Sequence, residues 1–298
     1  MKKKLLSLCT GALLLSGLAV SAADAPKKLL VVTTTAGFRH SSIPTAEKVL
    51  KELAEKTGAF TLDFVQQPEG APTAPRNANE EAQAAFREAK AQWDAKLAKA
   101  LEKLGPESLK NYDGVIFANT TGDLPIPDKE GFLKWLESGK AFIGMHSATD
   151  TFPRWPEYIQ MIGGHFLRHG PQVGVECCVQ DTGHPATAHL GNLWPIALEE
   201  IYLFRNYDAS RVTELLYLDK HPNNKTPGRY PVSWTREFGK GKVFYTSLGH
   251  REDIWDVDPN IRDRKNPVET SKAFQTHILG GIYWALNIRG PMVWEKAD

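Results

Sequence analysis

The feature that most constrains the fold is an alternation of short apolar runs with amphipathic segments over residues 28–145. Residues 28–35 form a continuous apolar, β-branched run, and similar runs recur at 60–66, 111–122 and 140–150. Between them, apolar residues recur at helical spacing in segments that end in glycine, at 42–58 and 128–139. Strands that are buried on both faces and alternate with helices are typical of a parallel sheet. The sequence therefore predicts an α/β fold.

The second half of the chain differs, because short predicted strands follow one another with turns between them. These strands lie at 172–180, 212–219, 230–238 and 241–249, and a closing helix follows at 270–287. No internal repeat is visible, so we expect one domain over 27–290 with a mixed sheet. Residues 68–106 have the composition of an insertion on that domain, with one charged amphipathic helix, or a broken pair, over 79–104.

The first residues predict export. Residues 1–22 join a basic start, "MKKK", to an apolar run that ends in small residues, which is typical of a secretory signal peptide. No comparable run follows, so we expect a periplasmic or extracellular protein without stable membrane insertion after cleavage. The net charge of +1, from 36 basic and 35 acidic residues, gives no indication of a nucleic-acid partner.

The cysteines exclude a disulfide-stapled fold. Beyond Cys9 in the signal segment, the chain has only Cys177 and Cys178. Adjacent Cα atoms lie about 3.8 Å apart, which is closer than an ordinary disulfide allows. Both thiols lie in a predicted strand, where packing is the favoured interpretation.

Histidines gather in the loops at the predicted strand ends. The loops at 34–42, 118–125 and 144–156 should meet at the carboxyl edge of a parallel sheet. Imidazole has a pKa near neutrality, so it can act as acid, base or metal ligand. A single histidine is more often a structural hydrogen-bonding group, but five occupy comparable glycine-containing loops: His40, His146, His165, His169 and His250.

The stretch "FIGMHSATD" is similar to the sharp turn on which many α/β enzymes mount a nucleophile, but it carries His146 at the central position. Ser147 is an unsuitable partner for His146, because neighbours on a strand point to opposite faces. We therefore predict general acid and base catalysis by His146 and His250, with Asp150 or another loop group orienting the ring of His146.

A divalent metal, with zinc the leading candidate, is an open possibility. His165 and His169 are four residues apart, so they would share one face and could share a metal if "GGHFLRHG" were helical. The segment lacks an H-E-x-x-H pattern and would make a short helix. The alternative ligand set, three histidines from separate loops, is His146, His169 and His250.

Two tryptophans and one long loop are further candidates for the site. Trp155 and Trp255 lie beside the histidine loops and could stack on the apolar face of a sugar, although packing is the commoner use of a tryptophan. The polar loop 250–269 is long enough to act as a lid.

The motifs of this chain resemble those of the trehalose-utilisation (ThuA-like) family, within the class I glutamine amidotransferase-like superfamily. The resemblance covers residues 28–288 and is carried by "TTAGFRHSS", "YDGVIFANTTGD", "GKAFIGMHSATD", "MIGGHFLRHG" and "PVSWTREFGKGKVFYTSLGH". It implies a flavodoxin-like three-layer sandwich with a mostly parallel central sheet. Position 146 is where related amidotransferases have a cysteine nucleophile, so thiolate chemistry is not implied here.

The resemblance also implies a polar pocket. His40, His146, His169 and His250 match motif positions of the family, and Glu200 with Tyr202 matches its acidic-aromatic signature. The side chains expected to bind substrate, including the two tryptophans, are Thr35, Arg39, His40, Thr121, Trp155, Glu200 and Trp255.

The family context points to carbohydrate catabolism. We expect a small carbohydrate as the ligand, specifically an oxidised (3-keto) glycoside or disaccharide, whose hydrogens beside the carbonyl are acidic enough for a histidine base. Lyase, isomerase or hydrolase chemistry could follow, with or without metal assistance. Two other hypotheses stay open: a carbohydrate-binding protein without catalysis, and a metal-dependent amide or ester hydrolase.

Overall fold

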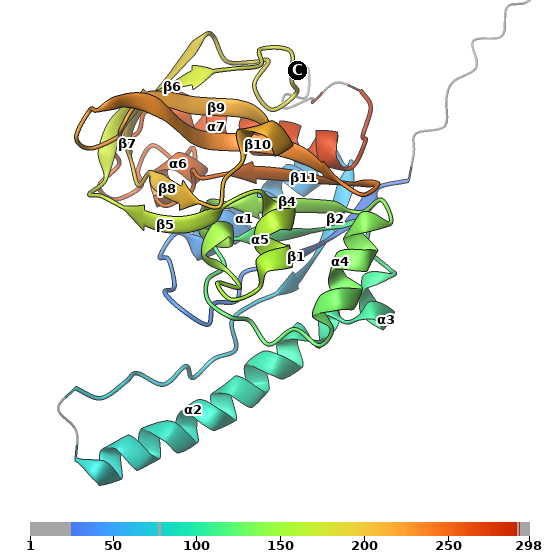
Figure 1. The fold of residues 1–298 in the computed structure, drawn as a ribbon, viewed down its shortest axis with the longest axis vertical. Coiled ribbons are helices and arrows are strands. Elements are labelled where there is room, and N and C mark those ends of the chain that lie inside the picture. The colour runs from blue at the N-terminus through green and yellow to red at the C-terminus, as the bar shows by residue number, and fades with distance from the viewer. Residues whose placement is uncertain (1–24, 77–78, 291, 293–298) are drawn as a thin grey trace, which may run out of the picture.

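The computed structural model describes residues 25–76, 79–290 and 292. In these residues, nine strands form one mixed sheet in the order β2-β1-β3-β4-β11-β10-β9-β6-β7 (Figure 1). The α/β class predicted from the alternating pattern is therefore confirmed. The predicted signal segment, residues 1–22, lies outside the described residues.

One half of the sheet is parallel and deeply buried. Its strands, in spatial order, are β2 (Phe60–Val65), β1 (Lys27–Val32), β3 (Gly114–Ala118), β4 (Ala141–Met145) and β11 (Gly241–Thr246). Every residue of β3 and β4 is buried, as expected for strands covered on both faces. The carboxyl ends of these strands form the edge at which loops meet.

The other half of the sheet is antiparallel. It continues from β11 through β10 (Pro227–Phe238), β9 (Thr213–Lys220), β6 (Val173–Val179) and β7 (Leu193–Glu199). The antiparallel half is larger than the description "mostly parallel" implies, although the parallel core is as expected. A second, two-stranded sheet pairs β5 (His165–His169) with β8 (Tyr202–Arg205).

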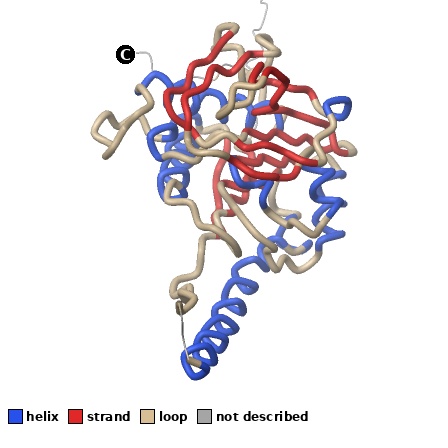
Figure 2. The backbone as a smooth tube through the Cα atoms, turned by 60° about the vertical axis from the view of Figure 1, so that its left-hand side comes forward, coloured by secondary structure: helices blue, strands red, loops and turns tan. Residues whose placement is uncertain are grey.

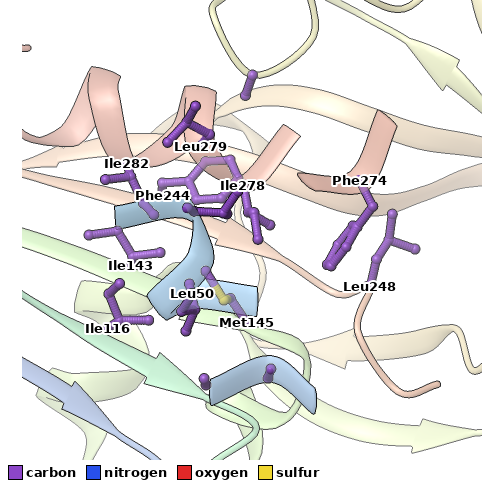
Figure 3. Packing of buried hydrophobic residues seen from close by; sticks show 14 of the residues in the cluster. Leu50, Ile116, Ile143, Met145, Phe244, Leu248, Phe274, Ile278, Leu279 and Ile282 are labelled. Carbon is purple, nitrogen blue, oxygen red and sulfur yellow. The ribbon is translucent and has the colours of Figure 1, made fainter. Parts of the chain in front are cut away.

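Helices cover both faces of the parallel core and complete a flavodoxin-like three-layer sandwich. On one face, α1 (Ile43–Thr57), α6 (Glu252–Trp255) and α7 (Val268–Ala285) pack together. Figure 3 shows this side, where Leu50 of α1 and Ile278 of α7 lie over Ile143 of β4. On the other face lie α3 (Pro106–Leu109), α4 (Lys129–Glu137) and α5 (Pro156–Ile162).

The helix α2 (Glu80–Leu101) projects from the body as an arm, shown in Figures 1 and 2. Its buried residues, Trp93, Leu97 and Leu101, all lie in its second half. A 3₁₀ turn at Glu102–Leu104 then leads to α3. The charged segment, predicted as one helix or a broken pair, is one continuous helix. Most of its first half is exposed.

Two further expectations from the sequence are settled by the fold. The segment "HFLRH", considered as a helix, is the strand β5 instead. Loop 250–269 contains α6 and is held closely to the body, because Arg264 donates a hydrogen bond to the Ser271 hydroxyl of α7 and Asn266 Nδ2 donates one to the Leu198 carbonyl oxygen of β7. Among the described helices, none combines the length and the apolar character needed to cross a membrane.

Candidate functional site

Four side chains from four separate connections meet at the carboxyl edge of the parallel strands. His40 follows β1, His146 follows β4, His250 follows β11, and Glu200 follows β7 of the antiparallel half. His146 is fully buried, while His40 and Glu200 are 5% and 7% exposed. One ligand atom from each of the four side chains lies within 4.8 Å of all the others.

His146 occupies the centre because of its unusual backbone. Its φ of 46° is sparsely populated by residues other than glycine. The Tyr245 hydroxyl donates a hydrogen bond of 2.7 Å to the His146 carbonyl oxygen, and His146 Nδ1–H donates to the Ser247 carbonyl oxygen at 2.8 Å. Because a carbonyl oxygen only accepts, Nδ1 carries the proton, so the lone pair of Nε2 faces the cluster.

The distances around His146 Nε2 fit a metal. His40 Nε2 lies 3.2 Å away, His250 Nδ1 lies 3.3 Å away, and Glu200 Oε1 lies 3.7 Å away. Glu200 Oε1 is also 3.3 Å from His250 Nδ1. With bonds of about 2.0–2.2 Å, ligand atoms of a tetrahedral zinc ion lie about 3.3–3.6 Å apart. The group of His40, His146, Glu200 and His250 could therefore hold a metal ion.

Burial keeps two of these imidazoles in the neutral form that binds metals. It lowers the pKa of His40 to about 4 and the pKa of His146 well below its usual value. Burial also lowers the pKa of His250, but the hydrogen bond that its ring donates to Glu200 and the negative charge of Glu200 outweigh that effect and raise the pKa overall. Metal binding at this cluster would therefore compete with a proton mainly at His250.

A second layer of hydrogen bonds fixes the loops. Glu199 Oε1 accepts from the backbone N–H groups of Glu200 and His250, at 3.1 Å and 2.9 Å. The Gly249 carbonyl oxygen accepts from Asn119 Nδ2 and Ser42 Oγ, at 2.9 Å and 3.1 Å. These contacts join the connections that follow β1, β3, β7 and β11, so the ligand atoms are held before any ion arrives.

His169 and His165 lie outside the four-atom cluster. His169 Nδ1 is 3.0 Å from Glu200 Oε2, and the His169 side chain is 42% exposed, so it lines the mouth of the site. The ligand set inferred from sequence, with His169, is corrected to the set with His40 and Glu200. His165 is buried and accepts a hydrogen bond from Arg205 Nε at 3.1 Å, which gives no support to a metal shared with His169.

Three residues expected to bind substrate make hydrogen bonds within the loops. The Thr35 N–H donates to Gln67 Oε1 at 2.7 Å, and Thr121 Oγ1 donates to the Phe38 carbonyl oxygen at 2.7 Å. Arg39 Nη1 donates to the Thr33 carbonyl oxygen at 2.9 Å. These hydrogen bonds stabilise the shape of the loop that carries His40, and a contact of the three side chains with substrate stays a prediction.

The two tryptophans do not form a sugar platform. Trp255 is fully buried, with Nε1–H donating to the Gly249 carbonyl oxygen at 2.9 Å. Trp155 is 7% exposed and packs against Phe152 and Tyr158. Both tryptophans therefore pack in the interior, which is the alternative role considered from the sequence.

Asp150 does not orient His146. Within the described residues, no hydrogen bond or ion pair joins Asp150 to that ring, which is fixed by Ser247 instead. Burial raises the pKa of Asp150 to about 6, although the nearby charge of Arg205 opposes the shift.

Sequence reasoning overlooked three residues of the site. Glu199 and Asn119 organise the loops through hydrogen bonds, and Phe38 stands exposed beside His40. Both Phe38 and Asn119 lie in strand-end loops that were identified from the sequence, 34–42 and 118–125, so position in such a loop was the available signal.

The chain is thus an α/β protein whose sheet edge carries a buried cluster of three imidazoles and one carboxylate. It belongs to the ThuA family, described as trehalose utilisation, whose model matches residues 28–285. The family resemblance inferred from the motifs is confirmed. No curated protein sequence matches the chain.

Two solved structures of ThuA-like proteins share the fold. The protein from Parabacteroides merdae has a TM-score of 0.62 at 20% identity, covering 91% of this chain and 93% of its own. The protein from Bacteroides uniformis has a TM-score of 0.56 at 20% identity, covering 90% and 95%. At this identity, the likeness shows the fold.

Proposed function

We propose that this chain is a metal-dependent enzyme of carbohydrate catabolism that acts on oxidised (3-keto) glycosides or disaccharides. The observation that carries the proposal is the buried cluster, where three imidazoles, two of them kept neutral by burial, and one carboxylate point at a common centre. Such an acceptor-rich centre in a buried site favours a divalent cation. Membership of a trehalose-utilisation family supports a sugar as the substrate.

The residues divide into metal ligands and one proton-transfer group. His40, His146, His250 and Glu200 would hold the ion, which would supply a Lewis acid for a substrate carbonyl. His146 is thereby reassigned from general base to ligand, because its free lone pair faces the cluster. His169 lies exposed at the mouth, with its Nδ1 hydrogen-bonded to the Gly170 carbonyl oxygen and 3.0 Å from Glu200 Oε2, so it is the imidazole that a bound sugar can reach.

In the proposed reaction, His169 takes a proton from the carbon next to the keto group. The electron pair of the broken C–H bond moves toward the carbonyl oxygen and forms an enolate. The enolate then expels the glycosidic oxygen from the anomeric carbon, which lies two carbons from the keto group. The departing alcohol takes the proton back from the His169 imidazolium, and the sugar is left as an unsaturated ketone. The step is a β-elimination, and it consumes no oxidant or reductant.

The test is turnover of a 3-keto disaccharide and its unoxidised parent, with and without a chelator. We expect product from the keto form alone, lost with chelator, restored by metal, and lost in His146→Ala. The matched control is Glu237→Gln, an exposed carboxylate near the opposite end of β10 from the site. Chelator-resistant turnover, or full turnover in His146→Ala, would refute the assignment.

The same cluster also favours a second candidate, a metal-dependent amide or ester hydrolase. In that case the same four residues would hold the ion, which would supply activation of water for attack on a carbonyl. An N-acetylated sugar and an acetyl ester in the same assay distinguish the two, because their cleavage without keto-sugar turnover would favour the hydrolase. Sugar binding without any product would favour a carbohydrate-binding protein.

We also propose that the chain is exported, on the basis of the basic and apolar run in residues 1–22. Fractionation of cells that express the full chain should place a shortened protein outside the cytoplasm. Full-length protein in the cytoplasm would contradict export.

A further inference from the structure

Phe38 is an exposed aromatic ring at the edge of the candidate metal site. Its side chain is 68% exposed, compared with 53% for Leu193 and 48% for Leu167, the other large apolar side chains described as exposed. Its ring centroid lies 4.9 Å from that of His40, with the rings nearly perpendicular. Phe38 therefore stands in water directly beside a proposed metal ligand.

The loop that carries Phe38 is fixed by hydrogen bonds. The Phe38 carbonyl oxygen accepts from Thr121 Oγ1, and the Ala36 N–H donates to the Thr121 carbonyl oxygen at 2.9 Å. The next loop passes so close that a Cβ on Gly122 would lie 2.7 Å from the Gly37 nitrogen. The contacts between these two loops therefore fix the backbone that holds the ring exposed.

A row of rings crosses the site from Phe38 to β5. The centroid of His40 lies 4.7 Å from that of His146, which lies 4.4 Å from that of Tyr202. Tyr202 in turn lies 4.3 Å from Phe166, which is half-buried on β5. Phe38 ends this row on the side of the β1–α1 loop, and it is the ring with the largest free face.

We propose that Phe38 is the stacking platform for a second sugar ring, next to the sugar that reacts at the metal. The apolar C–H face of a pyranose suits an exposed aromatic ring, and covering that ring removes apolar surface from water. The substrate is therefore a glycoside whose leaving group is itself a sugar. This inference rests on the proposed function and names its substrate class.

The test compares a keto-disaccharide with a small keto-glycoside. Trehalose and methyl α-glucoside, each in its 3-keto form, are assayed with Phe38→Ala, Phe38→Trp and the wild type. We expect Phe38→Ala to reduce the preference for the disaccharide, as a ratio of kcat/KM values, roughly tenfold to a hundredfold, mainly through KM. Phe38→Trp should keep that preference.

Leu193→Ala is the matched control, because it removes an exposed apolar side chain from the far end of β7, six residues from Glu199. It should keep the disaccharide preference. An unchanged preference in Phe38→Ala, or an equal loss in Leu193→Ala, would overturn the platform.

Direct binding keeps this inference separate from the proposed function. Unoxidised trehalose, titrated into the full chain and followed by NMR, should bind the wild type more tightly than Phe38→Ala by a similar factor. If no keto-sugar is turned over but this difference holds, the proposed reaction fails and the platform stands. Equal binding by both proteins, or no binding by the wild type, would overturn the platform.

Discussion

At the scale of single residues, the backbone of His146 explains the geometry of the cluster. A left-handed residue at the end of β4 turns the ring inward, and the Ser247 carbonyl selects the tautomer whose free lone pair is Nε2. Sequence identified His146, His40, His250 and Glu200 individually, through their loops and the family motifs. It did not separate metal ligands from substrate-binding groups, because that depends on distances between loops remote in sequence.

Glu200 is predicted to be essential for metal affinity. Glu200→Gln removes the negative charge that faces the metal and should weaken binding of Zn²⁺ about a hundredfold or more. Isothermal titration calorimetry of the chelator-treated protein measures the affinity, with Glu237→Gln as the control. Equal affinity in wild type and Glu200→Gln would show that Glu200 is no ligand.

Tyr245 is predicted to support the site without touching the metal. Tyr245→Phe removes the hydroxyl that donates to the His146 carbonyl oxygen and lies 3.0 Å from Thr149 Oγ1. Leaving buried polar groups unpaired should lower the free energy of unfolding by about 1–3 kcal/mol. Urea denaturation measures this cost, and a loss well below 0.5 kcal/mol would contradict the role.

At the scale of elements, the prediction succeeded where local pattern decides and was wrong where a distant partner decides. The helix α1 could be read from Ala46, Val49, Leu50 and Leu53, with Gly58 in a left-handed conformation at its end. The segment 165–169 could not, because it becomes a strand by pairing with 202–205. Likewise, the sequence could place Trp255 near the site but could not show that the ring is buried.

The two halves of helix α2 should contribute differently to the global stability of the protein. Leu97 is 1% exposed, so Leu97→Ala should cost about 2–5 kcal/mol of stability. Ala85 is exposed in the projecting half, where Ala85→Gly weakens the helix locally by about 1 kcal/mol. Because that half projects from the body and is mostly exposed (Figure 1), the global unfolding midpoint should barely change in Ala85→Gly. Similar midpoint losses in both variants would contradict the division.

At the scale of the whole molecule, the site joins the two halves of the sheet. The three imidazoles follow strands of the parallel half, whereas the carboxylate follows β7 at the far end of the antiparallel half. The parallel core could be predicted from sequence, because continuous apolar strands alternate with helices. The path of the chain that brings Glu200 back to the edge of the parallel strands could not be predicted, because it depends on the order of the strands in space.

Global stability should fall in mild acid because of a buried histidine far from the cluster. His277 is fully buried, and burial lowers its pKa to about 3. In the unfolded chain its pKa is about 6.5, so below that pH the unfolded state binds the extra proton. Stability should therefore fall as the pH drops from about 6.5, by up to about 1.4 kcal/mol per pH unit from this group.

The variant His277→Gln tests this assignment, because glutamine does not titrate. Urea denaturation between pH 6.5 and pH 4.5 should show a shallower loss of stability in the variant than in the wild type. Parallel pH profiles would contradict the role of His277.

We expect four side chains from four connections to bind one divalent ion. Anomalous X-ray diffraction from crystals of the Zn²⁺-treated protein, recorded at the zinc absorption edge, tests this expectation. We predict one strong peak within bonding distance of His40 Nε2, His146 Nε2, His250 Nδ1 and Glu200 Oε1. A fully ordered site without a peak, or a peak bound elsewhere while these four side chains remain free, would contradict it.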